Sequence, residues 1–233
     1  AAGASISLDR DQANYLVNVL RMTAGAPVLV FNGRDGEWLA RLAGDRKRAS
    51  LTVESETRPQ TAAGTLDYLF APLKQARLDY MVQKAVEMGA ARLRPIITRR
   101  TQVTRLNEDR LRANAIEAAE QCGILAIPEI TAPLSLDACL SGWEKAEGGR
   151  RIVFCDEDEA GADPIAVLKA LPPSPLGVLI GPEGGFSPEE RATLKSLPFV
   201  TAIALGPRIL RADTAAVAAL ALVQAAVGDW REA

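Results

Sequence analysis

The sequence predicts an α/β domain with a mainly parallel sheet, preceded by a small domain of antiparallel strands. The prediction depends on a change of pattern along the chain. Up to residue 57, short β-like runs alternate with turn-rich segments, whereas from residue 65 apolar strands alternate with helices. Between them, RPQTAAG (58–64) has the composition of a linker. We therefore place the two domains at residues 1–62 and 63–233.

The first domain is expected to form a small β-barrel or meander. A helix is predicted over 11–22, followed by strands over 26–31, 37–42 and 49–56. The segments NGRDG (32–36) and AGDRKR (43–48) join these strands, and such turns usually connect antiparallel neighbours. The second turn also adds Arg46, Lys47 and Arg48 as positive charges of this domain.

The second domain is expected to alternate strand and helix up to its end. Predicted strands cover residues 65–73, 92–98, 151–157, 176–181 and 199–206. Predicted helices cover 76–90, 107–123, 164–171, the segment after Ser187, and the alanine-rich stretch 213–227. Such alternation is typical of a parallel sheet covered by helices.

Composition excludes several kinds of chemistry. The 233 residues have a formal charge of −2 and include no histidine, which removes the commonest general base and metal ligand. Cys122, Cys139 and Cys155 lie far apart and form no CxxC motif, so we expect no metal centre and a reducing cytoplasm. We see no signal peptide and no apolar stretch long enough to cross a membrane.

The segment LIGPEGGFSPEE (179–190) predicts a strand, a glycine-rich turn and a helix that begins after Ser187. Neither the Walker pattern nor GxGxxG is present, and Glu183 would repel a phosphate. A ligand that is neutral or cationic at this point, such as S-adenosylmethionine, is compatible with the acid. A tight turn without any ligand is the alternative interpretation of this segment alone.

A second turn, AIALGPRILRADTAAV (202–217), repeats the order strand, Gly-Pro, helix, with Asp213 or Thr214 as the expected cap. Turns at the carboxyl ends of strands in an open α/β sheet meet in one crevice, where such sheets bind ligands. Arg208 and Arg211 lie between the second turn and its helix. For each arginine alone, a solvated surface charge is an equally good interpretation.

Together these motifs resemble the RsmE family of 16S rRNA uridine-N3 methyltransferases, in the SPOUT superfamily. The resemblance also covers VNVLRM (17–22), LKQARLDYMVQKAVEMG (73–89) and IEAAEQCG (116–123). It departs from the family pattern at TRRT (98–101), Ile124 and RADT (211–214). The resemblance implies a PUA-like β-barrel, a SPOUT α/β domain with a C-terminal trefoil knot, S-adenosylmethionine as cofactor, and a homodimer that modifies 16S rRNA in the small ribosomal subunit.

The site residues fall into three groups, of which the cofactor pocket and the RNA contacts are carried over by position from the resemblance. For the chemistry, since the chain has no histidine, we hypothesise that Arg211 stabilises the uracil anion and that Glu183 or a water takes the proton of the imide nitrogen. The cofactor pocket would comprise Phe154, Leu179, Gly181, Glu183, Gly184, Gly185, Leu205, Gly206, Ile209, Leu210 and Arg211. RNA contacts would come from Arg21, Lys74, Lys84, Arg99, Arg100 and Arg105, the last three within a run that also holds Arg92 and Arg94.

Two alternatives stay open at this point. The first is another SPOUT activity, such as ribose 2′-O-methylation, against which the VLR, LKQ and EQCG segments argue. The second is a non-catalytic RNA-binding assembly factor, against which the two intact glycine turns argue.

Overall fold

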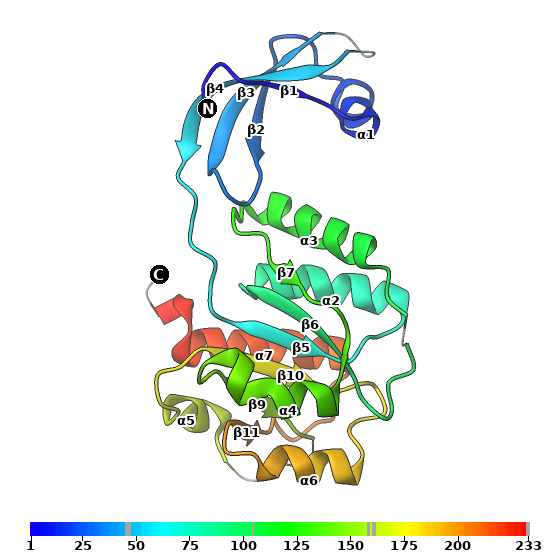
Figure 1. Cartoon of the computed structure of the whole chain (residues 1–233), viewed down its shortest axis with the longest axis vertical. Coiled ribbons are helices and arrows are strands. Elements are labelled where there is room, and N and C mark those ends of the chain that lie inside the picture. The colour runs from blue at the N-terminus through cyan, green and yellow to red at the C-terminus, as the bar shows by residue number, and fades with distance from the viewer. Residues whose placement is uncertain (45–47, 104, 158, 160–161, 232–233) are drawn as a thin grey trace. The chain divides into compact units, whose positions relative to one another are not determined.

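The computed structural model describes residues 1–44, 48–103, 105–157, 159 and 162–231. The chain divides into two compact units, which are described separately (Figure 1). Unit 1 comprises Ala1–Ala62 and Ile124–Ala126, and unit 2 comprises Ala63–Gly123 and Ile127–Ala233. Among the described residues, no helix is both long and apolar enough to span a bilayer.

Unit 1 contains an antiparallel four-stranded sheet in the order β1-β4-β3-β2. Its strands are Ser5–Ser7 (β1), Pro27–Phe31 (β2), Glu37–Ala43 (β3) and Ser50–Arg58 (β4). Apolar residues alternate along β3 and β4, so one face of the sheet is buried. This confirms the predicted antiparallel β domain, whereas β1 was not predicted.

The helix of unit 1 is shorter than predicted and changes type. Helix α1 covers Arg10–Asn14 and begins with a capping box between Asp9 and Gln12. A π-helical turn, η1 (Tyr15–Val19), follows, and the chain then reverses at Arg21, which has a φ of 54°. The uninterrupted helix expected over 11–22 is therefore wrong. Its apolar residues Ala13 and Leu16 still face the core of this unit.

Unit 2 is built on a seven-stranded parallel sheet in the order β11-β9-β10-β5-β6-β7, with β8 also paired to β6. The central strands β5 and β10 are buried at every residue, as expected for a sheet covered on both faces. The strands are Asp67–Phe70 (β5), Arg92–Ile97 (β6), Glu129–Ile130 (β7), Leu134–Ser135 (β8), Arg151–Cys155 (β9), Leu176–Ile180 (β10) and Val200–Ile203 (β11).

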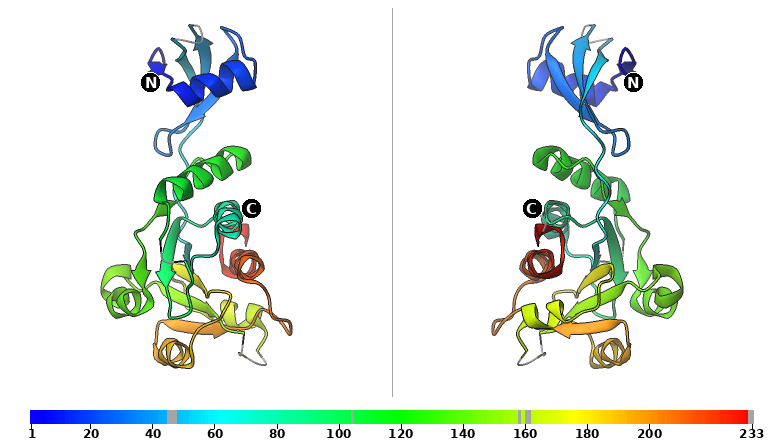
Figure 2. Two further views of the ribbon diagram at one scale, coloured as in Figure 1. Left: turned by 90° about the vertical axis from the view of Figure 1, so that its right-hand side faces the viewer. Right: turned by 90° about the vertical axis from the view of Figure 1, so that its left-hand side faces the viewer.

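Helices cover both faces of this sheet (Figure 2). On one face, α4 (Leu136–Glu147) and α6 (Pro188–Ser196) bury Trp143 and Leu194 against Phe154 and Leu179. On the other, α7 (Ala212–Val227) packs against β10, α2 (Gln75–Glu87) and α5 (Pro164–Lys169). Helix α3 (Glu108–Cys122) packs on α2, and a 3-10 turn, η2 (Asp229–Arg231), follows α7. The predicted α/β alternation is confirmed, whereas α4 was not predicted.

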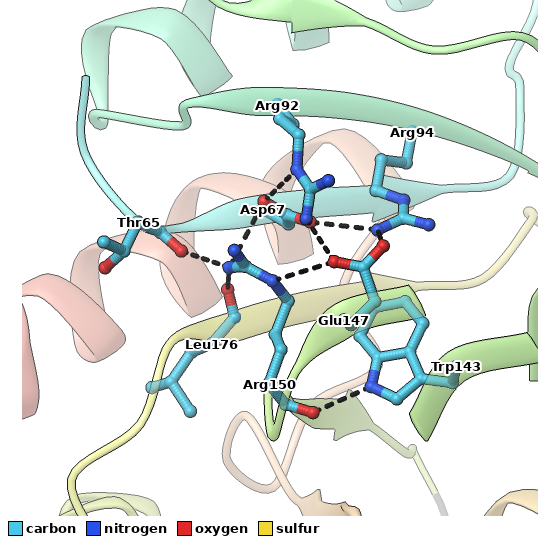
Figure 3. A network of polar contacts seen from close by, with 8 residues as sticks. All are labelled: Thr65, Asp67, Arg92, Arg94, Trp143, Glu147, Arg150 and Leu176. Atoms are coloured by element: carbon cyan, nitrogen blue, oxygen red, sulfur yellow. Dashed lines mark hydrogen bonds and ion pairs between the residues drawn. The ribbon is translucent and has the colours of Figure 1, made fainter. Parts of the chain in front are cut away.

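An ion network ties the amino ends of β5 and β6 to the end of α4 (Figure 3). Asp67 and Glu147 accept from Arg92 and Arg94, and Arg150 lies 3.3 Å from each carboxylate. Arg94 is 8 % exposed, so it cannot reach a phosphate at the surface. Arg92 is half-buried and pairs with the same two acids, Asp67 and Glu147. The network therefore engages both arginines of the expected RNA-binding run.

Candidate active site

A cavity of about 870 Å³ opens at the carboxyl ends of β9, β10 and β11. Its wall begins at the last residues of β9 and β10, Cys155 and Ile180, and at Ala204, which directly follows β11. Ligand sites in open α/β sheets occur at this edge. Although β9 separates β10 from β11 in the sheet, the two glycine turns line the same cavity.

The glycines of the first turn, residues 181–187, have different structural roles. Gly185 has a φ of +67°, which favours glycine. A Cβ on Gly181 would lie 2.6 Å from the ring of Phe186, so this glycine allows that ring to pack beneath the turn. The predicted capping box is present: the Glu190 amide donates to Ser187 Oγ, and the Ser187 amide donates to Glu190 Oε2. The helix α6 thus starts where the sequence predicted.

The second turn, residues 204–211, forms the opposite part of the cavity lining. Gly206 has a φ of +99°, and the side chain of Ile209 is 83 % exposed. Arg211 is the N-cap residue of α7 and makes no side-chain capping bond. The predicted caps Asp213 and Thr214 lie inside the helix instead, because the helix already begins at Ala212.

Charges of both signs surround the cavity, and most were not predicted. Arg77, from the first turn of α2, lies 3.7 Å from Glu183 and compensates part of its charge. Asp156 is fully buried and pairs with Arg191 at 3.3 Å and with Lys195 at 2.8 Å. The charged residues lining the cavity are Arg77, Asp156, Glu157, Glu159, Asp163, Glu183, Arg191, Arg208 and Arg211. The acids of VFCDEDE (153–159), at and after the end of a predicted strand, were the available signal.

The structure brings together most of the predicted pocket residues. Those that line the cavity are Gly181, Glu183, Gly185, Leu205, Gly206, Ile209, Leu210 and Arg211. Phe154 and Leu179 do not: both are fully buried, since each lies on a central strand one residue before the cavity begins. Gly184 is also absent from the lining and faces Arg100 instead, with Arg100 Cβ 3.5 Å from the position of an added Cβ.

Cys155 lines the cavity at the end of β9. Burial raises the pKa of its thiol to about 12. Near pH 7 the side chain is therefore a neutral thiol and not a nucleophilic thiolate. It contributes packing to the cavity wall.

The basic residues predicted to contact RNA have different surroundings. Arg99 and Arg100 follow β6 and contact the first glycine turn and α6, whereas Arg105 and Lys74 are exposed. Lys84 is paired with Glu87 at 2.6 Å. Arg21 is exposed in unit 1, and Arg46 and Lys47 lie outside the described residues.

Comparisons with known proteins agree with this architecture. Residues 60–224 match a family model described as an RNA methyltransferase domain, and residues 8–54 match an RNA methyltransferase PUA domain. The parallel sheet with its cavity, preceded by the antiparallel domain, thus has the two-part organisation of this class of RNA methyltransferases.

Relatives match along nearly the whole chain. Ribosomal RNA small subunit methyltransferase E from Rickettsia conorii is 30 % identical, with 96 % of this chain and 91 % of the relative covered. The protein of that name from Bacillus subtilis is 27 % identical over 94 % of this chain and 89 % of its own. The chain belongs to the family of ribosomal RNA small subunit methyltransferase E, as the sequence motifs predicted.

Solved structures show the same fold. A protein from Legionella pneumophila, determined in complex with the bound cofactor SAM, has a TM-score of 0.80 at 30 % identity and covers 97 % of this chain and 93 % of its own. Ribosomal RNA small subunit methyltransferase E from Neisseria gonorrhoeae has a TM-score of 0.82 at 24 % identity, with the same coverage.

Proposed function

We propose that this chain transfers the methyl group of S-adenosylmethionine to N3 of a uridine in 16S rRNA of the small ribosomal subunit. The observation that carries the proposal is the convergence of both glycine turns on one cavity, with Arg211 and Glu183 in its lining. Family membership supports the RNA class of substrate.

The cavity suits the proposed cofactor in size and charge. Its volume of about 870 Å³ lies in the range of small-molecule sites. Carboxylates and arginines share the wall, so an ammonium and a carboxylate of one zwitterionic ligand both find opposite charges. Backbone groups of the turns at Gly181 and Gly206, with the residues beside them, would hold the cofactor. When bound, S-adenosylmethionine supplies an electrophilic methyl group.

Arg211 would stabilise the negative charge that develops on the uracil when N3 loses its proton. A guanidinium stays charged at every relevant pH and can donate to a uracil carbonyl oxygen. It lies in the cavity wall at the start of α7 and is exposed there, so a bound substrate that excludes water would strengthen the interaction. We assign Arg211 the role of electrostatic catalyst.

The proton from N3 would pass to Glu183 or to a water. Glu183 is the residue of the first turn that carries a carboxylate into the cavity lining. Arg77 also lines the cavity, 3.7 Å from Glu183 Oε1, and would hold the carboxylate in place.

The remaining parts of the proposal concern assembly and context. The resemblance implies a homodimer and a trefoil knot, and the small residues of α7 and the strand order β11-β9-β10 are compatible with them. We place the reaction in the cytoplasm, on assembled small subunits, with no metal and no membrane involved.

The test measures methyl transfer to small subunits that lack the modification, with the methylated atom identified by mass spectrometry. Arg211→Gln is expected to lower kcat by about 10²- to 10³-fold, because it removes the charge that stabilises the anion. Arg208→Gln, which removes the same charge from the same loop, is the comparison. Binding of S-adenosylmethionine is measured separately by calorimetry.

Three results would contradict the proposal. Methyl groups on the ribose oxygen would indicate a 2′-O-methyltransferase. Equal losses in Arg208→Gln and Arg211→Gln would remove the special role of Arg211. A folded native chain that binds no S-adenosylmethionine would favour the RNA-binding assembly factor.

A further inference from the structure

The loop after β6, residues 98–101, is docked on the first glycine turn. The loop is closed on itself, since the Thr98 amide donates to Thr101 Oγ1 at 2.9 Å and the Thr101 amide donates to the Thr98 carbonyl at 3.2 Å. Arg99 and Arg100 stand in its middle. The loop is thus a compact element that presents two adjacent arginines.

Glu190 joins this loop to the turn by a buried carboxylate, which is 6 % exposed. Oε2 accepts from the Ser187 amide at 2.8 Å, and Oε1 accepts from the Arg99 amide at 2.8 Å. One side chain therefore satisfies two backbone donors from segments 88 residues apart.

Arg100 makes a second connection. Its Nη1 donates to the Gly184 carbonyl at 2.8 Å. The stem of the side chain also covers Gly184, with Cβ and Cδ 3.5 and 3.6 Å from the position of an added Cβ. Arg100 therefore restrains the backbone of the turn directly beside Glu183 and Gly185, which line the cavity.

Arg99 is held much more weakly. Its guanidinium pairs with Glu189 at 2.9 Å, but the two side chains are 61 % and 64 % exposed. Solvent screens an exposed pair of this kind, so an incoming phosphate can replace Glu189 at little cost. Within one loop, Arg99 is available to a ligand while Arg100 is engaged with the turn.

We propose that Arg100 and Glu190 are positioning residues for the cofactor turn, so that the loop expected to meet RNA also sets the shape of the cofactor site. The inference rests on the proposed function. An RNA phosphate at Arg99 and a cofactor at residues 181–185 would then act on one connected element, and each would affect the affinity for the other.

The experiment compares cofactor binding in the absence of RNA. Arg100→Gln is expected to weaken S-adenosylmethionine binding about five- to tenfold, the loss of one charge-assisted hydrogen bond. Glu190→Gln is expected to act in the same direction, because its amide nitrogen cannot accept from a backbone amide. Arg100→Lys, which keeps a donor and the charge, should recover part of the affinity.

Arg105→Gln is the matched control. It removes an exposed arginine nearby, and no hydrogen bond joins Arg105 to the described residues of the turn. This variant is expected to raise KM for RNA without changing the cofactor Kd. If Arg100→Gln behaves in the same way, Arg100 is an RNA contact alone and the inference fails.

Hydrogen exchange of the amides in residues 181–187 requires no ligand. It therefore tests the positioning role of Arg100 independently of the proposed methyltransferase function. Exchange in Arg100→Gln should be faster than in the native chain, at equal thermal stability. Faster exchange in a chain that binds no cofactor would overturn the proposed function and leave the positioning role. Unchanged exchange and unchanged Kd, in a chain that binds the cofactor, would overturn the positioning role alone.

Discussion

At the scale of single residues, the hydroxyl of Tyr68 stands out because it is buried without a hydrogen-bond partner among the described residues. Tyr68 lies on β5, stacked on Phe70 at 5.1 Å between ring centroids. Burial raises the pKa of the phenol well above its usual value, followed by repulsion between the phenolate and the ionised forms of Cys155 and Asp213. The group stays neutral, yet its lost hydration is not compensated.

We predict that Tyr68→Phe raises the free energy of unfolding by about 1 kcal/mol, since it removes an unsatisfied buried hydroxyl and keeps the ring. Urea unfolding followed by circular dichroism measures the change. Tyr80→Phe, at a side chain that is 46 % exposed, should change stability by less than about 0.5 kcal/mol. A destabilised Tyr68→Phe chain would mean that the hydroxyl has a partner.

Single residues also mark the limit of prediction from sequence. The glycines, Glu183 and Arg211 could be expected at a ligand site. The order of an apolar strand, a glycine-containing turn and a helix can be recognised in the sequence itself. Arg92 and Arg94 could not be told apart from Arg99 and Arg100 in one basic run. Their partners Asp67 and Glu147 lie 25 and 53 residues away, and nothing in the local pattern brings them near.

At the scale of elements, the ion network connects β5, β6 and α4 at the edge of the sheet opposite to the cavity (Figure 3). Burial alone would raise the pKa of Glu147, but hydrogen bonds from Arg92 and Arg94 outweigh it, and the pKa is lowered. A lowered pKa in the folded state means that the carboxylate stabilises the fold above its unfolded pKa, about 4.3. This contribution disappears as the pH falls through the folded value.

Glu147→Gln is therefore expected to cost about 3 kcal/mol at pH 7, because the change leaves buried guanidinium groups short of a counter-charge. The difference from the native chain should shrink below about pH 4.3. Denaturant unfolding at several pH values tests both statements. Glu144→Gln, on an exposed position of the same helix, is the control. A pH-independent difference would show that packing and not charge is responsible.

Elements with strong local patterns were the ones predicted. The buried runs of β5, β9 and β10 and the capped start of α6 have apolar sequences or cap residues that act locally. Helix α4 was missed because Ser141 and Gly142 interrupt it with weak helix formers, and it is held by burying Trp143 under the sheet. Helix α1 was overextended, since the pattern of 11–22 does not distinguish a π turn from a continued α-helix.

At the scale of the whole molecule, charge distribution matters more than charge total. The formal charge is −2, yet Arg21, Lys74, Arg99 and Arg105 are exposed, while Arg100 is engaged with the Gly184 carbonyl. If each of these four exposed residues contacts one phosphate, the slope of log K against log salt concentration should be about −3. Filter binding of small subunits or rRNA at several salt concentrations measures it.

Arg99→Gln should reduce the magnitude of that slope by about 1, because one phosphate contact is lost. A slope near zero would contradict RNA binding through these residues. A slope that Arg99→Gln leaves unchanged would place the contacts elsewhere on the chain.

The raised pKa of Cys155, in the cavity wall, has a consequence for the lifetime of the enzyme. An enzyme that handles an alkylating agent many times risks alkylating itself, and sulfur is the softest target a protein offers. With a pKa of about 12, Cys155 carries about one thiolate in 10⁵ molecules near neutrality. A cofactor bound in this cavity would therefore meet a neutral thiol at Cys155, which is a poor acceptor for its methyl group.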